Sequence, residues 1–120
     1  MRINITARHF KLNEELKSFV EEEVFRLKKY FTGIIDTEVI LSWEKFHRLA
    51  EIHVAVFGDR LKAEERSEDM KKSITLAVDK LERQLIKYKE RLHHFEHEKT
   101  QGQPIVEEPN TSSENPGESF

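Results

Sequence analysis

Basic side chains at helical spacing are the residues of this chain best suited to binding chemistry. Apolar residues recur every three to four positions between residues 70 and 95, which predicts an amphipathic helix. Projected at about 100° per residue, one flank of the apolar stripe is mostly basic. The bases on that flank are Lys72, Lys80, Arg83, Lys87, Arg91 and His94.

A second, smaller set of bases lies on an earlier predicted helix. If the two helices pack side by side, both sets form one basic strip. Evenly spaced cations on a rigid support match the phosphates of a nucleic acid. The alternative is a solvated helix face, on which bases pair with nearby acids such as Glu90. The candidate RNA-binding residues of the strip are Arg26, Lys29, Lys80, Arg83, Lys87 and Arg91.

Other constellations give weaker signals. His93 and His97 are four residues apart and could share a metal ion, but no carboxylate at a suitable spacing completes the site. The chain has no cysteine, which excludes a thiolate zinc site and a cysteine nucleophile. It also shows no Gly-rich phosphate loop. We therefore expect no metal, no cofactor and no enzymatic activity.

Composition favours a soluble, single-domain protein. The 120 residues fit one domain, and 36% of them are charged. No stretch approaches the roughly 18 apolar residues that a membrane span needs. Residues 1–10 lack the apolar run of a signal peptide. We expect a cytoplasmic protein with neither a membrane partner nor a small-molecule substrate.

The charge is distributed unevenly. From Glu98 onward there are five acids and one base, whereas residues 1–97 hold 19 bases and 18 acids. All three prolines also lie in the last segment. The pattern predicts a folded binding domain over residues 1–98 and a disordered acidic tail over residues 99–120.

The elements that must position the cations follow from apolar periodicity. Helices are expected from Asn13, a candidate N-cap, to Gly33, and from Ser67 to about residue 97. Gly58-Asp59 predicts a tight hairpin turn. Alternation predicts four strands, at residues 3–6, 38–43, 51–56 and 61–64.

The order β-α-β-β-β-α implies an α+β fold, with a four-stranded sheet and two helices packed on one face. The first crossover should be right-handed if the strands that it joins are parallel neighbours. The other face of the sheet should be wet. It carries Asn4, Thr6, Glu51, His53, Lys62 and Glu64.

Three short runs, in this order of elements, resemble the ribosome hibernation promoting factor family, including its ribosome-associated translation inhibitor members. The similarity covers about residues 1–95. Lys71 departs from the pattern, because family members often have an aromatic residue there. The matching runs are Asn4-Ile5-Thr6, Glu68-Asp69-Met70 and Lys80-Leu81-Glu82-Arg83-Gln84-Leu85.

The resemblance implies that the domain binds the small ribosomal subunit in the mRNA and tRNA channel. It implies silencing of idle ribosomes by occupancy, under stress or in stationary phase, with the six cations of the strip contacting ribosomal RNA. The chain resembles the short members of the family, which divide between those that promote ribosome pairing and those that oppose it. Residues 105–108 loosely resemble an acidic inhibitor-type tail.

Two other interpretations stay open. A general double-stranded RNA-binding module would share the logic of a sheet with two helices on one face. A protein-interaction regulator would instead use Phe25, Phe46 and the end of the last helix, because exposed aromatic residues can mark a contact surface.

Overall fold

The computed structural model describes the backbone of residues 2–101 and the side chains of residues 2–92. The chain divides into two compact units, Met1–Tyr88 and Lys89–Phe120. The first unit holds the sheet, the first helix and the first part of the last helix. Most of the predicted acidic tail, and the side chains of His93, His94 and His97, lie outside the described residues.

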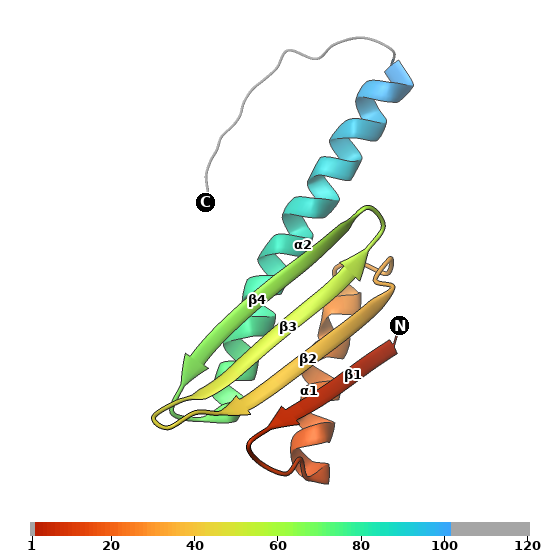
Figure 1. Cartoon of the computed structure of the whole chain (residues 1–120). Helices are drawn as coiled ribbons and strands as arrows, with labels where there is room; N and C mark the ends of the chain where they lie inside the picture. Colours follow the sequence, from red (N-terminus) through yellow and green to blue (C-terminus); the bar gives the residue numbers. More distant parts are fainter. Residues whose placement is uncertain (1, 102–120) are drawn as a thin grey trace. The chain divides into compact units, whose positions relative to one another are not determined.

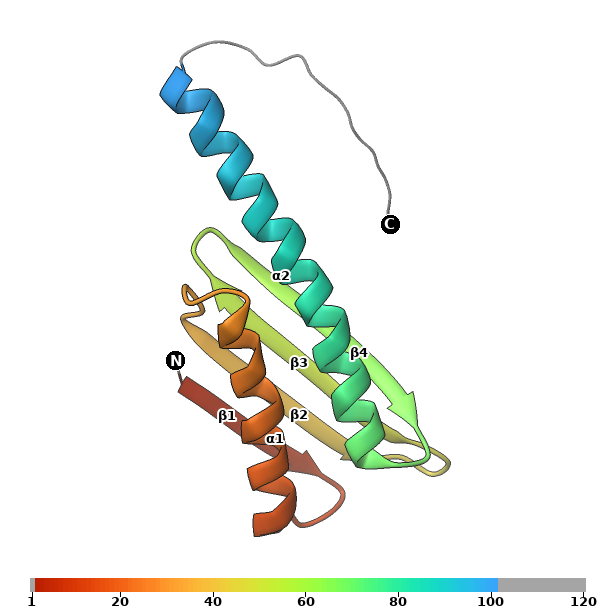
Figure 2. The same ribbon diagram turned by 180° about the vertical axis from the view of Figure 1, so that it is seen from behind.

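The elements follow the predicted order, and the expected α+β class is confirmed. In the first unit both helices cover the same face of a four-stranded sheet (Figures 1 and 2). Along the chain, the elements are β1 (Arg2–Arg8), α1 (Glu14–Arg26), a 3-10 helix η1 (Leu27–Lys29), β2 (Asp36–Trp43), β3 (Arg48–Val56), β4 (Asp59–Ser67) and α2 (Met70–Gln101).

The strands lie in the sheet in chain order, β1-β2-β3-β4. β1 and β2 are parallel, so α1 makes the crossover between neighbours, and the other two pairs are antiparallel. Alternate residues of the two central strands, such as Val39, Leu41, Ile52 and Val54, are buried under the helices. The apolar stripe of α2 packs against the helix-covered face of the sheet and completes the core. Its buried residues include Ile74, Val78, Leu81, Leu85 and Tyr88.

α1 begins where the sequence indicates but ends earlier. Asn13 is its N-cap, and the side-chain Oδ1 accepts a hydrogen bond from Leu16 N at 2.8 Å. The expected end at Gly33 is wrong, because the α-helix stops at Arg26 and tightens into η1. Apolar spacing could not show this, since α- and 3-10 turns repeat after similar numbers of residues.

The expected hairpin turn is confirmed, with its centre one residue earlier than Gly58-Asp59. Val56 pairs with Asp59, which leaves Phe57 and Gly58 as a two-residue connection. Gly58 has φ +76°, in the left-handed region where a side chain would be strained. α2 runs to Gln101, past the suggested boundary at residue 98. No helix among the described residues is long and apolar enough to cross a membrane.

The N-cap of α1 gives a test of the fold. Asn13→Ala should lower the free energy of unfolding by about 1 kcal/mol, because the Leu16 N–H loses its acceptor. Asn13→Gly should lower it by only about a few tenths of a kcal/mol. Urea denaturation followed by circular dichroism measures both. Equal destabilisation by the two variants would contradict the capping role.

Candidate nucleic-acid interface

One flank of α2 is fixed against β4 and its hairpin by three polar contacts, spaced four residues apart. Lys80 Nζ lies 2.8 Å from Glu65 Oε2. Gln84 Nε2 donates to the Lys62 carbonyl at 2.8 Å, and Tyr88 Oη donates to the Phe57 carbonyl at 2.5 Å. We call these contacts the α2–β4 ladder. The ladder and the buried stripe together fix which side of α2 faces water.

The water-facing side of α2 carries the cations that suit a ligand best. Lys72, Arg83 and Lys87 are all exposed there. Among the described side chains, Lys72 and Arg83 make no ion pair, whereas Lys80 is held by Glu65 in the ladder. Arg91 is also exposed, one turn after Lys87 along the same helix. Arg83 is therefore a charge on a fixed backbone that no acid of the described chain compensates.

Arg26 departs from the predicted strip. Its Nη2 lies 3.1 Å from Asp79 Oδ1 and 3.1 Å from Glu82 Oε2, both on α2, and its Nη1 lies 3.7 Å from Glu23 Oε1. Burial lowers the pKa of the Arg26 guanidinium, but the attraction of Glu23, Glu82 and Asp79 outweighs this and raises it. Arg26 is thus a paired charge between the two helices, and its predicted contact with RNA stays a prediction.

A second cation, Lys71, also joins the two helices, but this one lies on α2 and its acidic partner on α1. Lys71 of α2 lies 3.0 Å from Glu15 Oε2 on α1, and its Nζ sits 5.4 Å from the centre of the Phe19 ring. Lys71 stands where relatives were expected to have an aromatic residue. Arg26 and Lys71 thus form ion pairs that connect α1 to α2. The two helices lie on the same face of the sheet (Figure 2).

Lys29 is exposed, but it lies in η1 and not in α1. Projection at 100° per residue does not apply across this tighter turn, so the predicted shared flank with Arg26 has no geometric basis. Among the described side chains, Lys29 makes no ion pair. It remains a candidate cation at the end of the first helical segment.

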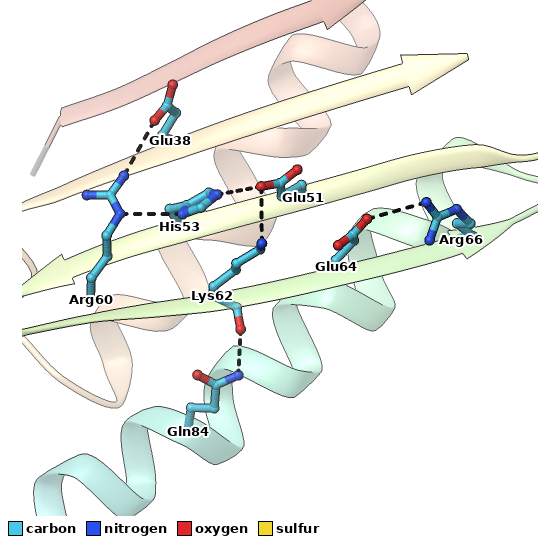
Figure 3. A network of polar contacts seen from close by, with 8 residues as sticks. All are labelled: Glu38, Glu51, His53, Arg60, Lys62, Glu64, Arg66 and Gln84. Carbon is cyan, nitrogen blue, oxygen red and sulfur yellow. Dashed lines mark hydrogen bonds and ion pairs between the residues drawn. The ribbon is translucent and has the colours of Figure 1, made fainter. Parts of the chain in front are cut away.

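The open face of the sheet carries bases too, and acids pair with several of them (Figure 3). His53 Nε2 donates to Glu51 Oε2 at 2.6 Å, while Arg60 Nε donates to His53 Nδ1 at 3.4 Å. Lys62 Nζ lies 3.7 Å from the same Glu51 oxygen. On the same face, Arg60 also pairs with Glu38 at 3.5 Å and Arg66 with Glu64 at 3.5 Å.

This network lowers the pKa of Glu51. The main cause is the hydrogen bond from His53, opposed by burial and aided by the charges of Lys62, His53 and Arg8. Asn4, Thr6 and Lys62 are exposed as expected, whereas Glu51 and His53 are half-buried. The bases of this face that pair with carboxylates are poorly placed to bind phosphates, whereas Arg2 and Arg8 on β1 make no ion pair among the described side chains. Lys72 and Arg83, which make no ion pair among the described side chains, lie on α2, which covers the opposite face of the sheet.

Exposed aromatic side chains lie at several places. Phe46 is 75% exposed and Phe25 is 59% exposed, as the sequence indicated for both. Phe57 is 85% exposed, and sequence reasoning did not single it out. Its place in a two-residue turn, where a side chain cannot reach the core, was the available signal. Among the described residues, no group of three or more potential metal ligands comes together.

Comparison with known proteins identifies the family. Residues 3–93 match the family described as Sigma 54 modulation protein / S30EA ribosomal protein. The chain belongs to this family. A ribosome hibernation promoting factor of Azotobacter vinelandii is 36% identical over 109 residues, which cover 91% of this chain and 98% of that protein. The protein of the same name from Escherichia coli K12 is 34% identical over 92 residues, covering 77% of this chain and 97% of that protein.

Solved structures agree with the fold. A ribosomal subunit interface protein from Coxiella burnetii matches with a TM-score of 0.71 and 28% identity, over 74% of this chain and 98% of that one. The N-terminal domain of Thermus thermophilus Protein Y matches with a TM-score of 0.69 and 30% identity, over 73% and 99%. The resemblance drawn from the three short runs is thereby confirmed at the level of the family.

The helix seam gives a test that separates structural from ligand-binding cations. Arg26→Gln should lower the free energy of unfolding by about 1 kcal/mol at neutral pH, because it leaves three carboxylates without a partner. Arg83→Gln should change it by less than about 0.5 kcal/mol. Urea titrations of both variants at pH 7 make the comparison. Equal effects would show that Arg26 does not fasten α1 to α2.

The sheet network predicts a pH dependence. Because the folded-state pKa of Glu51 is lowered from 4.5, its contribution to stability is complete above that pH and is lost as pH falls through the folded-state pKa. The stability advantage of the wild type over Glu51→Gln should therefore shrink as pH is lowered from 6 to about 3. Thermal melts across this range measure it, with Glu68→Gln as an exposed control. An advantage that is constant with pH would contradict the network's role.

Proposed function

We propose that this protein binds the small ribosomal subunit and keeps idle ribosomes inactive. Membership in the S30EA family and relatives named ribosome hibernation promoting factor support association with hibernating ribosomes. The solved relative described as a ribosomal subunit interface protein points to the same partner. The finer parts of the proposal are occupation of the mRNA and tRNA channel, and action under stress or in stationary phase, in the cytoplasm.

The observation that carries the RNA-binding part is the outer face of α2, the exposed side of the helix on which Lys72, Arg83 and Lys87 lie and on which Lys72 and Arg83 make no ion pair with a described side chain. We propose that Arg83 and Lys87 form the centre of the contact with ribosomal RNA, with Lys80 and Lys29 at its margin, and that Arg91 of the second unit also contacts RNA. Arg26 acts indirectly, by holding α1 against Asp79 and Glu82 so that these acids are compensated beside the contact. Without Arg26, the two carboxylates would repel phosphates that approach Arg83.

The mechanism requires no reaction. Cations on a rigid helix displace the counterions of RNA phosphates, and the entropy of the released ions favours the complex. An RNA surface made of helices presents backbone and minor groove, so shape and phosphate spacing matter more than base sequence. A protein seated in this way silences a ribosome by occupying a site that translation needs. About four phosphate contacts would give a slope of log K against log salt near −3.

The central variant is Arg83→Glu combined with Lys87→Glu. Both side chains are exposed and lie off the buried stripe, so the fold should persist. Binding to vacant small subunits should weaken by at least about tenfold, because two favourable phosphate contacts become repulsive. Co-sedimentation through sucrose at two salt concentrations measures the affinity.

The matched control is Lys11→Glu with Lys17→Glu, which makes the same change in net charge at two exposed lysines outside α2. If both double variants bind as well as the wild type, the α2 face is not the contact. If both lose affinity equally, the attraction depends on net charge and not on a docking face. Competition by a plain RNA duplex as strong as that of small subunits would indicate a general double-stranded RNA-binding module.

A further inference from the structure

Phe57 is a large apolar residue whose side chain is almost completely exposed to solvent, because it lies in a tight turn. At 85% exposure, it is the most exposed large hydrophobic residue of the described chain. Phe57 and Gly58 form the whole connection between β3 and β4. Because Val56 pairs with Asp59, no further residue is available to lengthen the turn. A ring at the tip of so short a turn cannot fold back onto the core.

The position of the turn is also fixed from the helix side. Tyr88 Oη donates to the Phe57 carbonyl at 2.5 Å, which makes Phe57 the last member of the α2–β4 ladder. Tyr88 is itself buried, and it packs edge-on against Phe31 with ring centres 5.3 Å apart. The hairpin end therefore lies beside α2, next to the turn that carries Lys87 (Figure 1).

Phe57 differs from the other exposed phenylalanines in what covers its ring. A lysine ammonium sits 5.5 Å from the ring centre of Phe25, and another sits at the same distance from Phe46. Among the described side chains, no cation and no aromatic ring stacks on Phe57. Both faces of its ring are thus accessible, and the turn that carries the ring lies beside the outer face of α2.

An open aromatic ring beside phosphate-binding cations is the arrangement that receives an unstacked nucleobase. Every base has a flat π-face, and stacking on a protein aromatic ring adds to affinity whatever the base. A protein partner fits less well, because the charged residues Asp59 and Arg60 follow the turn directly and an interface core is depleted of charged residues.

We propose that Phe57 stacks on an unpaired nucleobase of the RNA whose phosphates contact the outer face of α2. This inference rests on the proposed function and adds to it a preference for RNA sites that contain an unstacked base. The cations attract any RNA backbone, whereas the ring favours a place where one base is out of the helical stack. A plain duplex has all its bases stacked and offers the ring no partner.

The test measures the binding of Phe57→Ala to vacant small subunits over a series of salt concentrations. Affinity should fall by about 5- to 150-fold, the range reported by alanine substitution at stacked bases. The slope of log K against log salt should stay that of the wild type, because stacking releases no counterions. Phe57→Trp should restore the affinity. Phe46→Ala, which removes a ring of comparable exposure elsewhere, should have no effect.

A second measurement uses two RNA hairpins of equal length, one fully paired and one with a single bulged adenine. The wild type should prefer the bulged hairpin, and Phe57→Ala should lose this preference. Loss of affinity for subunits without loss of the preference would mean that the ring meets a ribosomal protein, and the inference would fail.

The inference and the proposed function fail in different ways. If wild-type protein binds small subunits and Phe57→Ala binds equally well, the stacking role is wrong and the proposed function stands. A shallower salt slope in Phe57→Ala would also overturn stacking, because the ring would then act only by positioning the cations. If the wild type itself does not bind small subunits, both proposals are wrong.

Discussion

The rotational setting of α2 on the sheet is the constraint on which the other features depend. Burial of its apolar stripe against the central strands supplies most of the energy, at about 25 cal/mol for each Å² of apolar surface removed from water. Burial alone is non-directional and tolerates small rotations of the helix. The three contacts of the α2–β4 ladder add direction, because each joins one side chain to one acceptor on β4 or its turn. Arg83 faces water as a consequence.

Charge compensation then separates the molecule into surfaces with different uses. On the open face of the sheet, several bases of β3 and β4 form ion pairs or hydrogen bonds with acids of the same face. Between the helices, Arg26 and Lys71 each form an ion pair with a carboxylate of the opposite helix. The outer face of α2 presents Lys72 and Arg83, two exposed cations without an ion pair among the described side chains, on a chain whose net charge is only −3. In the proposed complex, RNA is attracted by the local arrangement of the cations on α2 and not by the net charge of the chain.

The sequence carried most of the fold and part of the site. Alternation and helical spacing report which side of an element is buried, so the element order, the Asn13 cap and the exposure of Arg83 followed from them. They do not report which neighbour an element meets. The pairing of Arg26 with Asp79 and Glu82 joins residues more than fifty positions apart, and a projection of each helix by itself cannot find it. Phe57 was overlooked for a related reason, since its meaning depends on the turn lying beside Tyr88.

The central claim is that the outer face of α2 meets ribosomal RNA and the open face of the sheet does not. Because the chain has no cysteine, a single introduced cysteine can carry an iron–EDTA reagent that cleaves nearby RNA. Leu76→Cys places it on the exposed side of α2 without removing a cation, and Thr6→Cys places it on the open sheet face. The account predicts strong, localised cleavage of small-subunit RNA from position 76 and weak cleavage from position 6. Strong cleavage from position 6 alone would contradict it.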